Sequence, residues 1–391
     1  MNEAVALYDL SPTVRLMLLG IVVALGPLAW VWLRNQQRPP AQRLASLTVL
    51  TLFLTFDLVL FGAFTRLTDS GLGCPDWPGC YGAVSPTGAH AQISAAQAAM
   101  PTGPVTHTKA WIEMIHRYLA TGVGVLILTL AVTSWLRRRE LPVHPAWPLV
   151  TLAWVCVQGA FGALTVTLKL QPVIVTLHLL GGLVLLALLC RQAVAYSQAW
   201  RPRTPLALAP GVRRLLVIVF TLVWVQVALG GWVSTNYAVL ACTDFPSCHG
   251  SWWPQMDFAQ GFEVWRPLGY SRTGEPLTLA ALTAIHYVHR LMAYLLLPLL
   301  VVLAWRLRSA GWPRAAGWVF ALAAWQFLTG LSNVVLGWPL AAAVSHTGGA
   351  AGLVVVFTWM LCELHPQRAA APERIASPAP YRAPGVQEMR G

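Results

Sequence analysis

Four histidines stand at matching places in two apolar halves of the chain. His116 and His178 lie in the first half, and His289 and His346 lie in the second. The two members of each pair come from different predicted membrane helices, so their rings can face each other across a bundle and ligate one haem iron from both sides. A single intramembrane histidine can instead hydrogen-bond a neighbouring helix. Four ionisable groups at repeated places favour the ligand interpretation, because such groups are costly in a membrane.

A carboxylate accompanies only the first pair. Glu113 lies three residues before His116, on the same face of a helix. The matching place in the second half, 173 residues later, is His286. A carboxylate beside a cofactor can act as a base or stabilise developing positive charge. Its alternative role is a favourable interaction with the start of its helix. The unequal pair predicts that the two halves do different chemistry.

An arginine directly follows the first histidine of each pair, at Arg117 and Arg290. A guanidinium group there could bind the propionate groups of a haem. It could also reach to the membrane interface while its aliphatic stem stays in the apolar region. The sequence leaves both roles open.

Two pairs of cysteines lie in the segments that follow long apolar runs. Cys74 and Cys80 form the first pair, and Cys242 and Cys248 form the second. The short spacing within each pair allows a disulfide, and disulfides persist outside the cytoplasm. We favour a structural staple in each loop. The alternative is a redox-active pair that exchanges electrons with a partner.

These features repeat at a nearly constant offset. An offset of 168 residues separates the members of five pairs: Gly62 and Gly230, Cys74 and Cys242, Cys80 and Cys248, Gln158 and Gln326, His178 and His346. His116 and His289 are 173 residues apart, because the second cysteine loop carries five extra residues. The regularity predicts an internal duplication, which decides the architecture.

The composition predicts an all-α polytopic membrane protein. The chain of 391 residues is 57% hydrophobic and 10% charged, whereas a soluble domain carries about 25% charged residues. Nine apolar runs of about 20 residues are long enough to span a bilayer. Each repeat supplies four spans, which predicts two four-helix bundles related by a pseudo-two-fold axis along the membrane normal. One further span precedes them.

This pattern divides the chain into five segments. They are the extra N-terminal helix with its basic loop (1–44), the first repeat (45–196), a linker (197–212), the second repeat (213–362) and a disordered tail (363–391). A large soluble domain is excluded, because no gap between the spans can hold one. The net charge of +12 is carried by arginines in short loops, so nucleic acid is not an expected partner.

The same arginines predict the orientation in the membrane. The loops at 34–43, 137–139, 191–214 and 306–314 all fall on one side, which the positive-inside rule makes cytoplasmic. The cysteine loops and the N-terminus are then outside, and the C-terminus is cytoplasmic. The first ten residues lack the basic region of a signal peptide and the arginines of a transit peptide. We therefore expect a multi-pass protein of a bacterial plasma membrane.

The motifs together resemble those of the haem A synthase family over about residues 45–362. The resemblance rests on the run Thr65-Arg66-Leu67-Thr68-Asp69-Ser70-Gly71-Leu72, the Cys74/Cys80 loop, Glu113-x-x-His116-Arg117, His178, His289-Arg290 and His346. Members of that family fold as two four-helix bundles produced by a duplication. The family core usually has eight spans, so the extra N-terminal helix of this chain is a departure.

The resemblance implies an activity and a division of roles. The C8 methyl of haem O would be hydroxylated twice, and loss of water from the gem-diol would give the formyl group of haem A for terminal oxidases. His289 and His346 would hold a resident haem b. His116 and His178 would receive haem O, with Glu113 at the reacting side. The resemblance suggests a haem O synthase as a partner, whereas the electron-transfer partner is not identified and a homo-oligomer is left open.

Two other functions remain as alternatives. A di-haem electron-transfer cytochrome would use two bis-histidine haem b sites and would need no carboxylate. A thiol–disulfide oxidoreductase would use the cysteine loops with a quinone, and its histidines would be dispensable. The carboxylate at position 113 favours the haem-oxidising enzyme over both.

Overall fold

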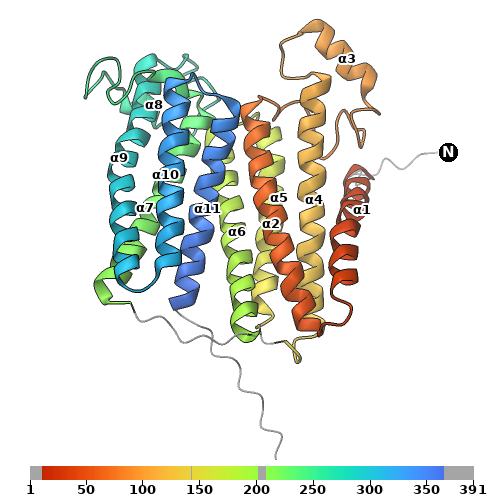
Figure 1. Cartoon of the computed structure of the whole chain (residues 1–391). Helices are drawn as coiled ribbons and strands as arrows, with labels where there is room; N and C mark the ends of the chain where they lie inside the picture. Colours follow the sequence, from red (N-terminus) through yellow and green to blue (C-terminus); the bar gives the residue numbers. More distant parts are fainter. Residues whose placement is uncertain (1–10, 142, 201–207, 365–391) are drawn as a thin grey trace, which may run out of the picture.

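The computed structural model describes residues 11–141, 143–200 and 208–364, and its long elements are all helices (Figure 1). Nine helices within these ranges are long and apolar enough to cross a membrane: α1 (Ser11–Arg34), α2 (Pro40–Leu67), α4 (His107–Leu136), α5 (Ala146–Thr167), α6 (Pro172–Trp200), α7 (Pro210–Thr235), α9 (Leu279–Ser309), α10 (Pro313–Val335) and α11 (Leu340–Leu364). The predicted nine-span helical fold is confirmed.

The long helices pack as two neighbouring groups of four (Figure 1). In the first group α2, α4, α5 and α6 contact one another in a ring, and in the second group α7, α9, α10 and α11 do the same. The groups meet where α11 lies against α2 and α6 and where α6 lies against α7. Each group brings together the helices that carry one predicted histidine pair. The duplication and the segment boundaries stay predictions.

Helix α1 packs against α4 at the side of the first group (Figure 1). Glycines allow the two backbones to approach: a Cβ on Gly122 would lie 2.8 Å from the Val23 side chain, and one on Gly20 would meet Thr121. The opposite face of α1 is apolar and exposed, for example at Leu18 and Val22, and suits contact with lipid. The extra helix therefore covers part of α4.

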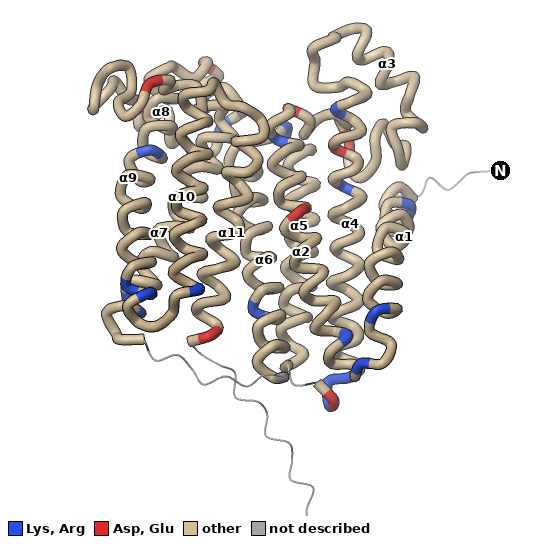
Figure 2. Tube along the Cα trace, in the orientation of Figure 1, with Lys and Arg blue, Asp and Glu red and all other residues tan. Residues whose placement is uncertain are grey.

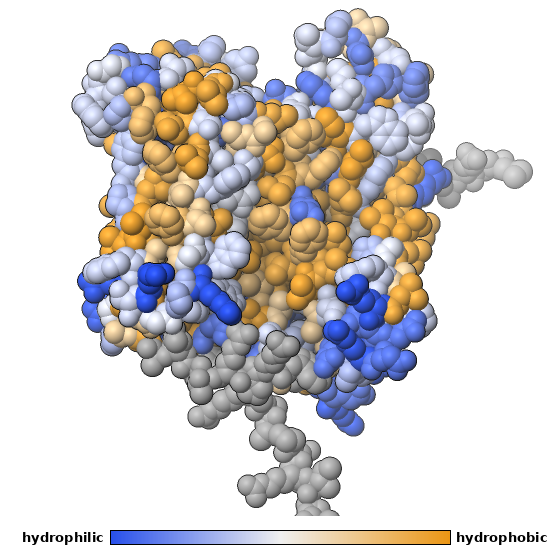
Figure 3. All heavy atoms as spheres, in the orientation of Figure 1, coloured by the Kyte–Doolittle hydropathy of each residue, from blue (hydrophilic) through white to orange (hydrophobic). Residues whose placement is uncertain are grey.

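Two long segments cover one end of the bundles, which we call the loop-bearing end. The first, residues 68–106, contains α3 (His90–Ala99), and the second, residues 236–278, contains the 3-10 helix η1 (Ala238–Ala241) and α8 (Phe258–Gly261). Lysines and arginines gather mostly at the opposite end (Figure 2), and an apolar belt lies between the two ends (Figure 3). The expected positions of the N-terminus and of the tail from residue 365 lie outside the described residues.

Candidate functional site

Helices α4 and α9, which carry the two His-Arg pairs, begin in the same way. The side-chain oxygen of Thr106 accepts a hydrogen bond from the backbone N–H of Lys109, and that of Thr278 accepts one from Ala281. Each threonine thus satisfies one of the free N–H groups at a helix start. These caps fix where the two helices begin beneath the cysteine segments.

Both predicted disulfides are present. Cys74 is bonded to Cys80 with a Cα–Cα distance of 4.9 Å, and Cys242 is bonded to Cys248 with a distance of 5.1 Å. All four cysteines are fully buried. Each disulfide closes a seven-residue turn, which we call the first and the second disulfide loop.

An aspartate organises the interior of each disulfide loop. The carboxylate of Asp76 accepts hydrogen bonds from the N–H groups of Tyr81 and Gly82, at 2.6 and 2.8 Å. The carboxylate of Asp244 accepts from the residues at the same offsets, at 2.8 and 2.9 Å. The hydrogen bonds, led by the one from the Gly250 N–H, lower the pKa of Asp244 to about 2. Each aspartate therefore holds its loop closed by accepting two backbone N–H groups.

Arg117 holds the first disulfide loop against α4. Its Nη1 donates to the backbone carbonyls of Asp76, Pro78 and Gly79, at 2.9, 3.2 and 2.6 Å. The side chain is 8% exposed. Because a guanidinium carries several donors in a fixed fork, one arginine can satisfy a whole turn of carbonyl groups.

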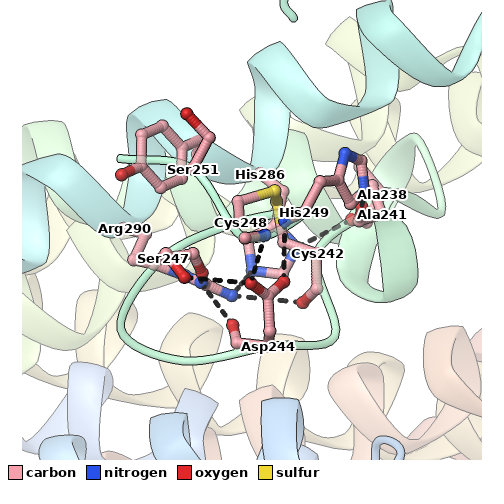
Figure 4. Close-up of a disulfide and its surroundings, with 12 residues drawn as sticks. Ala238, Ala241, Cys242, Asp244, Ser247, Cys248, His249, Ser251, His286 and Arg290 are labelled. Carbon is pink, nitrogen blue, oxygen red and sulfur yellow. Dashed lines mark hydrogen bonds between the residues drawn. A yellow bond between two sulfur atoms is a disulfide. The ribbon is translucent and has the colours of Figure 1, made fainter. Parts of the chain in front are cut away.

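Arg290 does the same for the second disulfide loop (Figure 4). It donates through Nη1 to the carbonyls of Asp244 and Ser247, at 2.7 and 2.6 Å, and through Nη2 to that of Cys242, at 3.1 Å. Two of these carbonyls, at positions 244 and 247, match the partners of the first arginine at the repeat offset. The sequence did not predict this loop-holding role. The binding of haem propionates by the two arginines stays a prediction.

Each arginine and the disulfide loop that it binds form an anchor. The residues at positions 113 and 286 complete the two anchors, but they differ in chemistry. Glu113 is 4% exposed; its carboxylate accepts from the Cys74 N–H at 2.7 Å and from Arg117 at 2.5 Å. His286 sits in the matching place (Figure 4), with Nδ1 3.0 Å from the Ala238 carbonyl and Nε2 3.4 Å from Arg290. Since arginine only donates, Nε2 accepts and Nδ1 carries the proton. One half thus has a carboxylate where the other has a neutral imidazole.

The two histidines of each predicted pair come from one bundle. His116 and His178 lie on α4 and α6, and His289 and His346 lie on α9 and α11. The ring of Phe61, on α2, lies nearly parallel to the His116 ring, with centroids 6.2 Å apart. Each bundle therefore offers two imidazoles from helices that lie diagonally in its ring of four.

Each of the four histidine rings lies against a glycine of a neighbouring helix. A Cβ added to that glycine would lie within 4 Å of the ring. The distances are 3.1 Å for Gly62–His116, 3.6 Å for Gly162–His178, 2.9 Å for Gly230–His289 and 3.2 Å for Gly330–His346. Glycine within a helix costs about 1 kcal/mol of stability relative to alanine, so its use at all four places indicates that the rings need the room. The sequence showed Gly62 and Gly230 as repeat members but gave no sign that they touch histidines.

The donor set fits two bis-histidine haem sites. Within the described chain, Nδ1 of His178 and Nδ1 of His289 are buried without a hydrogen-bond partner. Two imidazoles in each apolar bundle, each given room by a glycine, suit ligation of a haem iron.

Comparisons with known proteins point in one direction. A family model named COX15-CtaA and described as a cytochrome oxidase assembly protein matches residues 45–358. A haem A synthase of Shewanella oneidensis is 42% identical over 313 residues, which cover 78% of this chain and 92% of the relative. A haem A synthase of Halalkalibacterium halodurans is 27% identical over 296 residues, covering 74% of this chain and 86% of the relative. The matches cover both bundles.

Proposed function

The chain belongs to the COX15-CtaA family, and from that membership we propose that its two bundles divide the work of a haem A synthase between them. It is a multi-pass bacterial membrane enzyme that oxidises haem O. The C8 methyl group of haem O becomes a formyl group by successive hydroxylations.

The first bundle is the proposed substrate site. His116 and His178 would hold the iron of haem O between them, and the iron centre supplies the oxidising chemistry. Phe61 and Gly62 shape the wall beside His116. Glu113, one turn toward the loop-bearing end, would act as a base or stabilise positive charge that develops at the methyl carbon. Its hydrogen bonds to Cys74 and Arg117 fix the carboxylate in place.

The second bundle is the proposed site of a resident haem b. His289 and His346 would hold it, in a site that carries His286 instead of a carboxylate. The observation that carries this division is the exchange of Glu113 for His286 within two otherwise matching anchors of arginine and disulfide loop. A di-haem electron-transfer cytochrome would have no need of that difference.

The distribution of basic residues and disulfides supports one orientation of the protein in the membrane. The gathering of basic residues opposite the disulfide loops (Figure 2) supports placing that end in the cytoplasm and the disulfide loops outside. Two disulfides at the loop-bearing end agree with an oxidising compartment there. Haem O would arrive through the bilayer or directly from the enzyme that makes it. An electron-transfer partner would exchange electrons with the enzyme during the oxidation.

The test is the identity of the haems in the purified protein, by extraction and mass detection. Wild type should contain haem b together with haem O or haem A. His289→Ala should lose haem b, whereas Glu113→Gln, which keeps a similar shape and an acceptor oxygen near Cys74, should keep haem b and lose haem A. Two haem b molecules in every preparation, with no haem A even when haem O is supplied, would favour the electron-transfer cytochrome.

A further inference from the structure

Thr329 on α10 is a hydrogen-bond partner of the His346 ring. Its Oγ1 lies 2.9 Å from Nδ1 of His346, and the side chain is buried, with 7% exposed. The threonine hydroxyl proton is used elsewhere, because Oγ1 also donates to the Trp325 carbonyl at 2.7 Å. A hydroxyl has one proton, so Oγ1 must accept from Nδ1–H of His346. The lone pair of the ring is therefore on Nε2.

This arrangement prepares His346 as a metal ligand. Gly330, on the same helix as Thr329, also lies against this side of the ring: a Cβ added to it would lie 3.2 Å from Cε1 and 3.7 Å from Nδ1. The Nδ1 side thus faces α10, and the Nε2 lone pair is turned away from it. A hydrogen bond to the far nitrogen of a ligating imidazole fixes its tautomer and ring orientation and raises its basicity.

The first bundle lacks this partner. The position that matches Thr329 at the repeat offset of 168 is Phe161, which has no hydrogen-bonding group. In the described chain, Nδ1 of His178, the counterpart of His346, has no hydrogen-bond partner. The glycine contact is retained, since Gly162 lies against the His178 ring. The two ligands therefore share their packing and differ in the support of Nδ1.

We propose that Thr329 is a positioning residue through which the second bundle retains its haem, and that Phe161 leaves His178 a weaker ligand from which haem is released. The inference rests on the proposed assignment of haem b to the second bundle and of haem O to the first. A resident cofactor must stay through many turnovers, whereas a substrate must enter and its product must leave. The contrast between a supported and an unsupported histidine meets these two needs.

The first experiment measures how fast the detergent-purified holoprotein loses haem b to excess apomyoglobin. Removal of such a hydrogen-bond partner typically weakens metal binding about 10- to 100-fold, so Thr329→Val should release haem b faster by that order. Thr329→Ser, which keeps the hydroxyl, should restore slow release. Ser332→Ala is the matched control: its hydroxyl makes the same kind of bond, to the Leu328 carbonyl, and is not bonded to a histidine.

A redox titration separates positioning from mere packing. A less basic His346 donates less charge to the iron, so the midpoint potential of haem b should rise in Thr329→Val and stay at the wild-type value in Thr329→Ser. The reciprocal variant, Phe161→Thr, offers His178 an acceptor. It should raise the amount of haem A that stays with the protein after turnover.

The results separate the role of Thr329 from the proposed function. If wild type holds haem b and makes haem A, but Thr329→Val loses haem b no faster than wild type and keeps its potential, the role of Thr329 is refuted while the proposed function stands. If wild type makes no haem A, or His346→Ala keeps haem b, the proposed function itself fails.

Discussion

The hydroxyl of Tyr237 donates a hydrogen bond of 2.6 Å to Oδ1 of Asp69, and the two residues are 168 positions apart, which is the offset of the predicted repeat. Arg66 joins the same contact: its guanidinium lies 4.0 Å from the centre of the Tyr237 ring and donates to the carbonyl of Ser234, also 168 positions away. Two equivalent positions touch only near an axis that exchanges the halves. These contacts therefore support the predicted pseudo-two-fold axis.

The Tyr237–Asp69 contact should help to hold the two bundles together at the loop-bearing end. We expect Tyr237→Phe and Asp69→Asn each to lower the unfolding free energy, and the double variant to lose less than the sum. The coupling energy should be about 0.5–1.5 kcal/mol, as for a partly exposed hydrogen bond. Denaturation of all four proteins in one detergent measures it, and additive losses would argue against a direct contact.

The arginine anchors should protect the disulfides from reductant. Lysine lacks the planar fork whose second nitrogen binds Glu113 in one half and the Cys242 carbonyl in the other. We therefore expect Arg117→Lys to speed the reduction of Cys74–Cys80 and Arg290→Lys to speed that of Cys242–Cys248, each about tenfold or more for the loss of buried charged hydrogen bonds. Thiol alkylation followed by mass detection reads each loop separately.

Arg137→Lys serves as the control for that experiment, because Arg137 is exposed and its side chain pairs with Glu140, away from both disulfide loops. Equal reduction rates in all variants would show that the arginines do not hold the loops.

The glycines beside the histidine rings should be required for haem binding. In Gly230→Ala the new methyl group would lie 2.9 Å from the His289 ring, and in Gly330→Ala it would lie 3.2 Å from the His346 ring. We expect both variants to bind haem b at least tenfold more weakly, because displacing a ligand ring weakens its bond to the metal. Gly317→Ala on α10, where a Cβ meets nothing within 4 Å, should bind normally. Haem content after purification is the readout.

The second disulfide loop should loosen in acid. The pKa of Asp244 is about 2, below its ordinary value of 3.8, because the carboxylate accepts N–H groups of the loop. A group whose pKa falls on folding stabilises the fold above its unfolded pKa, and this contribution is lost as the pH falls through the folded value. Protection of the Gly250 amide from hydrogen exchange should therefore fall between about pH 4 and pH 2.

Asp244→Asn should lack that pH dependence, since its side chain does not titrate. An unchanged fall in protection in this variant would assign the effect to another group.

Much of the fold followed from the sequence, because each span must be about 20 apolar residues long and each disulfide pair is close along the chain. The nine helices and both disulfides are where the patterns predicted them. The histidines were found because ionisable groups stand out against an apolar background. These features are all local, so spacing alone reveals them.

The parts of the site that spacing did not reveal depend on contacts between helices. Arg117 and Arg290 bind loop carbonyls some 40 residues earlier in the chain, and nothing in an arginine's neighbours predicts which oxygens it will reach. Thr329 faces His346 only because α10 and α11 pack at one particular rotation. The sequence alone does not single out a threonine in a helix, because its hydroxyl can bond the backbone of its own helix.

His116 and Arg117 are consecutive residues of one helix, and so are His289 and Arg290. The first member of each pair is a proposed haem ligand, and the second donates hydrogen bonds to carbonyls of the disulfide loop. A tilt or rotation of α4 or α9 would therefore displace the proposed haem ligand and the covering loop together, because both are attached to adjacent residues of one helix. A disulfide loop could therefore move away from either site only if the arginine lost its hydrogen bonds to the loop carbonyls or if the histidine moved with the loop.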